Sequence, residues 1–184
     1  MLAISESVSC SYDKYHAILT TPNREIKSAE YLRLRGLEVY LPLFSKSIRW
    51  RRSIHRPKSF AVIPGMLFIP KEMMDVIDRD RIFYGAHVYG YLRSSLGYPS
   101  VLTTKDIDLI RGIEVRLNEQ TKKSPSGFVV GQKVRLRDEM YSAYLGQGEV
   151  VEVLAHGKKI GILVPQLFSR PTKLYVPATD LVAM

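Results

Sequence analysis

The chain has 184 residues, of which 46% are hydrophobic and 24% are charged, a composition typical of soluble globular proteins. This length allows one domain or two small ones, and the composition excludes a wholly disordered chain, a collagen-like repeat and a coiled coil. The longest apolar run, residues 61–69, is far shorter than the roughly 20 residues of a membrane helix. We therefore expect a cytoplasmic protein without a membrane span, and its one cysteine, Cys10, cannot form an internal disulfide.

The positive charge is concentrated near the front of the chain. There are 27 Lys and Arg residues against 18 Asp and Glu residues, a net charge of +9. Between Phe44 and Phe60 no acid occurs, and the basic residues there are Lys46, Arg49, Arg51, Arg52, Arg56 and Lys58. Such a field attracts polyanions such as nucleic acid. The alternative is a solvated basic hairpin or loop with no dedicated partner.

Extended and helical patterns alternate over the first two thirds of the chain. Strands are predicted at residues 15–20, 37–41, 59–69 and 88–93, the third of them broken by Pro64 and Gly65. Helices are predicted over residues 24–35, before Gly36, and over residues 105–119, where Thr103 and Asp106 supply the start. This mixture predicts an α/β sandwich over residues 13–120, with helices on an antiparallel sheet.

A change of composition separates this part from the rest. Residues 121–127 carry no large apolar side chain and contain a proline and a glycine, so we place a linker at residues 121–129. No helical periodicity is visible in residues 130–184. Short strands are predicted there at residues 133–137, 149–154, 160–164, 172–176 and 181–182. They indicate a small five-stranded β-barrel, and the whole chain is predicted to be α+β with two domains.

No arrangement of side chains typical of an enzyme is found. The four histidines are scattered without the spacing of metal ligands, and one cysteine cannot support a thiolate zinc site. The glycines form neither a dinucleotide fingerprint nor a phosphate loop, and no serine has the context of a nucleophile elbow. We expect a binding protein that is not an enzyme and has no metal and no cofactor.

One stripe of the first predicted helix is typical of a nucleic-acid surface. At 3.6 residues per turn it contains Arg24, Lys27, Tyr31 and Arg35. Cations that bind phosphate and a ring that stacks on a base are the usual components of such a surface. The opposite, apolar face contains Ile26, Ala29 and Leu32. The alternative is an ordinary amphipathic helix with an exposed basic face.

Apolar residues gather around the turn at Pro64 and Gly65. Ile63 precedes it, and alternation along a strand places Met66 and Phe68 on the same side. If that side is exposed, each side chain buried by a partner contributes about 1.5–3 kcal/mol to association. The alternative is that these are plain core residues.

Several segments of the chain follow one another in a specific order. Before the linker they are Pro22-Asn23-Arg24-Glu25, residues 31–36, residues 37–42, the arginine-rich stretch and residues 62–69; after it they are residues 130–138, 141–146, 148–153 and 167–170. Over residues 13–184 this order resembles the NusG family of transcription elongation factors, with an N-terminal NGN domain and a C-terminal KOW domain of SH3-like barrel fold. The helix start and residues 38–42 look closer to the specialised paralogues, typified by RfaH, than to housekeeping NusG.

The resemblance implies a division of labour between the domains. The family's N-terminal domain binds the clamp helices of RNA polymerase through an apolar depression and suppresses pausing. By position, that depression would be lined by Ile18, Ile63, Met66 and Phe68. Specialised members also read the non-template DNA strand. The candidates for nucleic-acid binding here are Arg24, Lys27, Tyr31, Arg35, Arg49, Arg51, Arg52, Tyr89 and Arg93.

The family's KOW domain contacts either the termination factor Rho or a small-subunit ribosomal protein. The residues that match this surface are Tyr141, Tyr144, Leu167, Phe168 and Arg170. The leading hypothesis is thus a monomeric elongation or antitermination factor. The alternative is a general RNA- or ribosome-associated KOW protein with the basic stretch 46–58 as its anchor.

Three features depart from the family pattern. Met66 stands where an aromatic residue is common, and residues 79–84 replace the His-Thr-Thr loop that RfaH uses. The third feature is a set of prolines that would fall inside helices if the C-terminal domain refolded into a helical hairpin, as RfaH's can: Pro165, Pro171 and Pro177. Each would cost about 3 kcal/mol, so a permanent barrel is predicted. The sequence leaves open whether the domains dock; docking over Met66 and Phe68 would mean autoinhibition.

Overall fold

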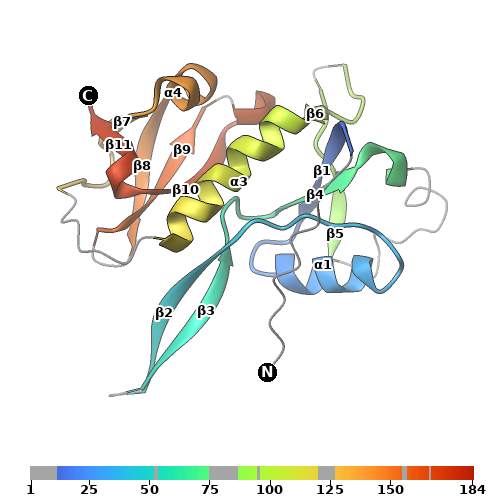
Figure 1. Cartoon of the computed structure of the whole chain (residues 1–184), viewed down its shortest axis with the longest axis horizontal. Helices are drawn as coiled ribbons and strands as arrows, with labels where there is room; N and C mark the ends of the chain where they lie inside the picture. Colours follow the sequence, from blue (N-terminus) through green and yellow to red (C-terminus); the bar gives the residue numbers. More distant parts are fainter. Residues whose placement is uncertain are drawn as a thin grey trace.

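A computed structural model of the chain describes residues 12–51, 54–74, 87–94, 96–119, 127–154, 157–165 and 167–184. It has mixed α and β structure with antiparallel sheets, as the sequence predicts. Figure 1 shows a first sheet beside helix α1 (Glu25–Arg33), a second sheet at the C-terminal end, and helix α3 (Thr104–Glu119) between them. A two-stranded ribbon projects away from both sheets (Figure 1). Residues 121–126 of the predicted linker lie outside the described residues.

The first sheet is built around β1 (Lys14–Thr20). This strand pairs antiparallel with β4 (Met66–Pro70) on one side, and with β5 (Val88–Tyr91) and β6 (Val101–Thr103) on the other. Ile18 lies opposite Leu67, whereas Ala17 lies opposite Phe68. Since neighbouring residues of a strand face opposite sides, these two pairs belong to different faces of the sheet.

Helix α1 covers the face that carries Ile18 and Leu67, and its buried residues are Glu25, Ser28, Ala29 and Leu32. Ile26 was expected on this apolar face, but it is 38% exposed. The helix is rotated because the Glu25 carboxylate turns inward and accepts a 2.7 Å hydrogen bond from the backbone N–H of Gly65. That bond fixes the helix start to the turn that precedes β4.

Helix α3 begins as predicted. The Asp106 carboxylate accepts hydrogen bonds from the backbone N–H and the hydroxyl of Thr103, at 2.6 and 2.8 Å. The apolar residues at helical spacing along it are buried, namely Ile107, Ile110, Ile113 and Leu117. They pack into the same hydrophobic cluster as Met66 and Phe68 on the second face of the first sheet.

The stretch between Leu37 and Ala61 differs from the prediction. The expected strand at residues 37–41 is reduced to one bridge, between Tyr40 and Phe68. The basic stretch that follows forms the ribbon instead, with strands β2 (Leu43–Arg51) and β3 (Ile54–Ala61). Of the ribbon residues beyond the base whose exposure is described, those at 47 and 56–58 are exposed and those at 46 and 48 are half-buried, so they lack the apolar alternation that reveals a half-buried strand.

The second sheet contains the five strands predicted after the linker. In space they run β10 (Thr172–Pro177), β9 (Lys159–Val164), β8 (Gln147–Leu154), β7 (Lys133–Leu136) and β11 (Leu181–Ala183). Neighbouring strands are antiparallel. Among the described residues no pairing joins the edge strands β10 and β11, so the sheet is open there and the closed barrel stays a prediction.

One helix in this part was not predicted. Helix α4 (Glu139–Leu145) follows β7, and the Asp138 side chain caps it by accepting a 3.0 Å hydrogen bond from the N–H of Met140. Seven residues with two buried side chains, Tyr141 and Leu145, give too short a pattern for a helical period to be recognised. Within the described part of the chain, no helix is long and apolar enough to cross a membrane.

Candidate functional site

The predicted polymerase-binding residues do not share one surface. Ile63, Met66 and Phe68 lie in one cluster on the α3 side of the first sheet. Ile18 lies in the cluster on the α1 side, where it packs with Leu32, and is fully buried. The grouping of Ile18 with the other three is therefore wrong. Ile63, Met66 and Phe68 are at most 1% exposed, so the apolar face that they form is covered in this structure.

The C-terminal sheet provides much of this cover. The ring of Phe168 packs edge-on against Phe68, with the ring centroids 6.2 Å apart. On β10 the N–H of Tyr175 donates a 2.9 Å hydrogen bond to the carbonyl of Val62, and the Tyr175 ring lies 5.1 Å from that of Phe44. A single hydrophobic cluster thus runs from the first sheet into the second.

Helix α3 makes a second set of contacts with the C-terminal part. The Arg116 guanidinium lies 4.4 Å from the ring centre of Tyr141 and forms a 3.0 Å ion pair with Asp180. Gly112 permits this approach, because a Cβ atom at this position would lie 2.4 Å from the Tyr141 hydroxyl oxygen. The absence of a side chain at Gly112 lets α4 approach α3 closely.

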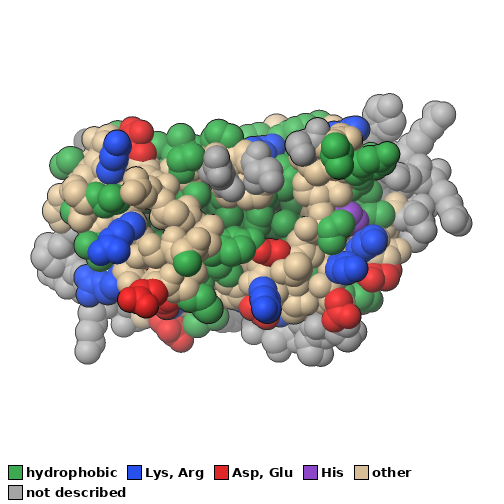
Figure 2. Space-filling model, turned by 90° about the horizontal axis from the view of Figure 1, so that it is seen from above, with side chains coloured by type: hydrophobic (Ala, Val, Ile, Leu, Met, Phe, Trp, Pro, Cys, Tyr) green, Lys and Arg blue, Asp and Glu red, His purple; other side chains and the backbone are tan. Residues whose placement is uncertain are grey.

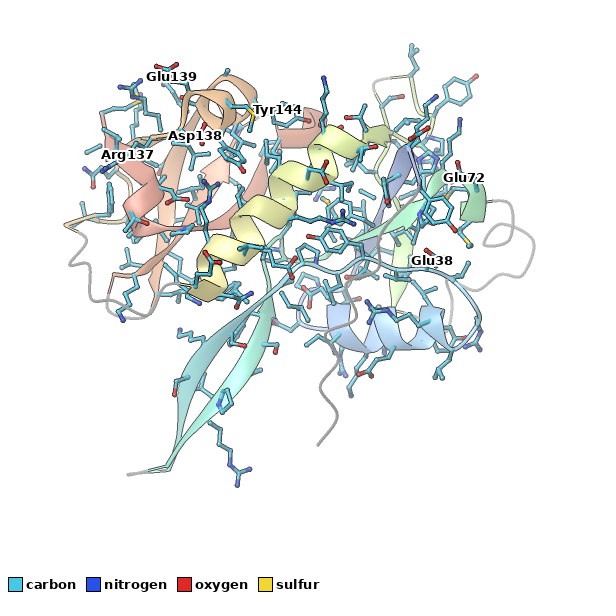
Figure 3. The ribbon with its side chains drawn as sticks, viewed as in Figure 1. Glu38, Glu72, Arg137, Asp138, Glu139 and Tyr144 are labelled. Carbon is cyan, nitrogen blue, oxygen red and sulfur yellow. The ribbon has the colours of Figure 1, made fainter. Side chains whose placement is uncertain are left out.

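The predicted partner-binding residues of the C-terminal part are largely used in these internal contacts. Tyr141 and Leu167 are buried, and Phe168 packs on Phe68. Tyr144, labelled on α4 in Figure 3, is exposed, and Arg170 is half-buried. In the described arrangement these five residues do not form one accessible surface.

The cationic stripe of α1 is exposed, with its one aromatic residue half-buried. Arg24, Lys27 and Arg35 are exposed. The Arg35 guanidinium lies over the Tyr31 ring, 3.5 Å from its centre. The structure thus brings Tyr31 and Arg35 together. Because the guanidinium covers one face of the Tyr31 ring, a base on that side would stack on the guanidinium plane rather than on the ring itself.

The ribbon presents one cross-strand pair of cations and further single cations. Lys46 lies opposite Lys58, and Arg56 lies opposite Ile48. Arg56 and Lys58 are exposed. The predicted residues Arg49 and Arg51 belong to β2, whereas Arg52 lies outside the described residues. On the face in Figure 2, by contrast, Lys and Arg side chains lie in small groups beside Asp and Glu side chains and hydrophobic ones.

The two remaining candidates lie on or next to β5. Tyr89 is 65% exposed and is free to stack on a ligand. Arg93 is exposed, but its guanidinium donates a 3.1 Å hydrogen bond to the Gly97 carbonyl and lies 5.0 Å from the Tyr91 ring centre. Tyr89 is therefore the more available of the two.

Sequence reasoning missed the residues that hold the base of the ribbon. From α3, the Glu114 carboxylate accepts a 2.7 Å hydrogen bond from the N–H of Leu43. The Asn118 side chain donates to the Leu43 carbonyl at 2.9 Å and accepts from the N–H of Ser45 at 3.1 Å. The i,i+4 spacing of Glu114 and Asn118 was a signal that they share a helix face, although it did not identify what they bind.

A third side chain reaches the ribbon base from the C-terminal sheet. The Lys159 ammonium donates a 2.8 Å hydrogen bond to the Ser45 carbonyl and lies 4.7 Å from the Phe44 ring centre. Lys159 is 7% exposed, and this burial lowers its pKa, with the neighbouring charge of Lys158 acting in the same direction. A buried ammonium is costly unless it is paired, so the Ser45 carbonyl is an important partner.

Close to this contact lies a polar cluster that joins side chains of β8 and β10. The Glu152 carboxylate accepts hydrogen bonds from the Lys173 ammonium and, at 2.7 Å, from the Tyr175 hydroxyl. Burial acts to raise the pKa of Glu152, but the bonds from Lys173 and Tyr175 and the charges of Lys173 and Lys46 outweigh it, so the pKa is lowered. The charge of Lys46 links this cluster to the ribbon.

No protein-family model and no curated protein matches the chain. Among solved structures it is similar to one described as "Domain interaction in Thermotoga maritima NusG", with a TM-score of 0.48 and 17% sequence identity. The match covers 92% of this chain and 96% of that one.

Proposed function

We propose that the protein is a transcription elongation or antitermination factor of the NusG type, closer to the specialised, RfaH-like paralogues, that acts in the cytoplasm as a monomer and by binding alone. Ile63, Met66 and Phe68 would bind the clamp region of RNA polymerase. The α1 stripe and the ribbon would contact the non-template DNA strand. One observation carries the proposal: the apolar face is covered by the chain's own C-terminal sheet, while exposed cations lie on α1 (Arg24, Lys27 and Arg35) and on the ribbon (Arg56 and Lys58).

The same observation supports autoinhibition. A polymerase that binds Phe68 must displace Phe168, and a partner that binds Phe168 or Tyr141 must separate the C-terminal sheet from β4 and α3. Each ligand therefore favours the open chain, and by linkage each raises the affinity for the other. The C-terminal part, as an SH3-like barrel, would then recruit Rho or a small-subunit ribosomal protein through Tyr141, Tyr144, Leu167, Phe168 and Arg170.

The test is retention of core RNA polymerase by the immobilised full chain, at about 0.3 M salt so that nonspecific charge binding is suppressed. Phe168→Ala removes the ring that covers Phe68, so we expect it to retain more polymerase than the wild type. Adding Phe68→Ala to this variant should abolish retention, with circular dichroism confirming that the double variant is folded. Tyr144→Ala, an exposed change in the same part of the chain, is the control and should leave retention unchanged.

A different result would favour the alternative function, a general RNA- or ribosome-associated protein. The ribbon, with Arg56 and Lys58 exposed and Lys46 half-buried beside them, is the observation that supports it. In that case no variant retains polymerase, while the full chain binds RNA at low salt and loses it when these three cations are neutralised.

A further inference from the structure

The base of the ribbon is held by side chains rather than by a neighbouring strand. Leu43 and Ser45, on the outer edge of β2, direct their backbone groups away from β3. Glu114 and Asn118 bind the Leu43 N–H, the Leu43 carbonyl and the Ser45 N–H. The Ser45 carbonyl is bound by Lys159. The backbone groups of this edge are therefore shared between α3 and the C-terminal sheet.

A small rotation at the base of the ribbon produces a larger displacement of its outer residues. From Ser45 to the end of β2 at Arg51 the ribbon extends about 20 Å, at roughly 3.3 Å per residue. A rotation of a few degrees at the base therefore moves the outer residues by more than an ångström. The Phe44 ring, one residue from Ser45, is enclosed by Phe60, Tyr175 and the Lys159 ammonium. These contacts make the position of the C-terminal sheet part of what determines the direction of the ribbon.

We infer that Lys159 is a positioning residue that couples the direction of the ribbon to the docked C-terminal sheet. The inference rests on the proposed role of the ribbon in nucleic-acid binding. In the docked chain, the bond from Lys159 to Ser45 aligns Lys46, Arg56 and Lys58 in one direction for contact with phosphates. When the C-terminal sheet undocks, Asn118 on α3 still accepts from the Ser45 N–H, but the Ser45 carbonyl loses its bond from Lys159. The ribbon is then free to rotate about its base. Opening of the chain thus changes how the ribbon meets nucleic acid as well as exposing the apolar face.

The chain offers a matched pair of variants. Lys159→Met keeps the apolar stem against Phe44 and removes the ammonium. Lys158→Met removes the same charge at the preceding residue. Lys159→Arg keeps a cation at this position that can donate to the Ser45 carbonyl. Asn118→Ala loosens the same edge from the α3 side without touching the C-terminal sheet, so the inference stays testable if Lys159→Met does not fold.

The direction of the ribbon is measured by residual dipolar couplings of its amides relative to those of α3, in the full chain. In the wild type, in Lys158→Met and in Lys159→Arg, we expect one alignment tensor to fit both elements. In Lys159→Met and Asn118→Ala, the ribbon couplings should shrink relative to those of α3. In Asn118→Ala the Ser45 amide loses its acceptor and should also exchange about fivefold faster, the effect of losing one ordinary hydrogen bond. If Lys159→Met leaves the couplings at wild-type values, the inference is overturned.

A second measurement separates this inference from the proposed function. A mixed-sequence 20-base-pair DNA duplex is titrated with each variant at several salt concentrations. If Lys158 contacts a phosphate, Lys158→Met should lower the slope of log affinity against log salt concentration by about 1. Lys159→Met should weaken binding several-fold more than Lys158→Met, and Lys159→Arg should recover it. Altered couplings together with equal DNA binding in all variants would support Lys159 as a positioning residue and contradict the ribbon as a nucleic-acid surface.

Discussion

Phe168 packs edge-on against Phe68 from a strained backbone conformation. The ring centroids are 6.2 Å apart, and Phe168 has φ 57° and ψ 42°, in the left-handed region. For a residue with a side chain this region costs about 1–2 kcal/mol. Burial of the Phe68 face offsets that cost in the docked chain. The contact that covers the apolar face is therefore made by a residue whose backbone would have a lower energy in a right-handed or extended conformation.

Two substitutions at Phe168 should distinguish the effect of losing the ring contact from the effect of relieving the backbone strain. Phe168→Ala and Phe168→Gly both remove the ring contact, but only glycine adopts the left-handed conformation without strain. Although glycine also makes the unfolded chain more flexible, we expect Phe168→Gly to have the higher free energy of unfolding, by up to about 1 kcal/mol. Urea denaturation measures the difference. An alanine variant as stable as the glycine variant would show that the backbone at this position is not strained.

Gly112→Ala should favour the open chain. The new Cβ atom would lie 2.4 Å from the Tyr141 hydroxyl oxygen, so Tyr141 must move away from α3. Alanine itself suits the helix better than glycine, by about 1 kcal/mol, so α3 should stay folded. We expect chemical-shift changes in α4 and on the Phe168 side of the interface, together with more polymerase retained.

Gly112→Ala with Tyr141→Phe provides the control. Removing the hydroxyl removes the clash, so this double variant should return towards the closed chain. If the double variant is as open as Gly112→Ala, the effect does not come from the contact between Gly112 and Tyr141.

Glu25 should stabilise the turn that leads into the apolar face. Its carboxylate is buried and accepts the 2.7 Å bond from the Gly65 N–H, and Gly65 has a φ of 75° that suits glycine. Glu25→Ala leaves that N–H without its acceptor, so we expect the free energy of unfolding to fall by about 1.5–3 kcal/mol. Glu25→Gln keeps an acceptor and should cost less. Equal stability of the two variants, measured by urea denaturation, would contradict this role.

The parts of the fold that could be predicted are those in which the local pattern is sufficient. The cap of α3 at Thr103 and Asp106 and the apolar positions along that helix are repeated signals, and the structure confirms both. The five C-terminal strands are short and alternate or are continuously apolar between turn residues. Such features need no knowledge of distant contacts.

The parts that could not be predicted depend on contacts between distant residues. Ile18 and Phe68 both look like apolar strand residues, but the register of β1 with β4 decides which face each occupies. Ile26 is exposed because the neighbouring Glu25 turns inward to bind the backbone N–H of Gly65, which lies 40 residues further along the chain. The covering of Phe68 by Phe168 joins residues 100 positions apart, which no local pattern reveals.

The cluster around Glu152 predicts a dependence of stability on acid pH. The pKa of Glu152 lies below its ordinary value of 4.5, so the ionised carboxylate favours the folded state. Its contribution is fully present above about pH 4.5 and is lost as the pH falls through the lowered pKa. Glu152→Gln should therefore be less stable than the wild type at pH 7, and the difference should shrink in acid.

The midpoint of thermal unfolding at a series of pH values measures this effect. Glu149→Gln, an exposed change on the same strand, is the matched control and should track the wild type. A constant difference between Glu152→Gln and the wild type from neutral to acid pH would show that the bonds of Lys173 and Tyr175 do not depend on the charge of Glu152.

Two cations on α1 should respond differently to substitution by alanine. Lys27 is exposed on the predicted nucleic-acid stripe, whereas the Arg33 guanidinium donates a 2.7 Å hydrogen bond to the Val39 carbonyl and serves the fold. We expect Lys27→Ala to weaken binding of single-stranded DNA and to lower the salt slope by roughly 0.7, the value for one phosphate contact, while the free energy of unfolding stays near that of the wild type.

Arg33→Ala removes the same charge from the same helix and should behave in the opposite way. It should lower the free energy of unfolding, because the Val39 carbonyl loses its donor. It should leave the salt slope unchanged, since Arg33 lies off the stripe that Lys27 shares with Tyr31. If the two variants weaken DNA binding equally, α1 acts only through its net charge, and the arrangement of Lys27, Tyr31 and Arg35 is not what nucleic acid recognises.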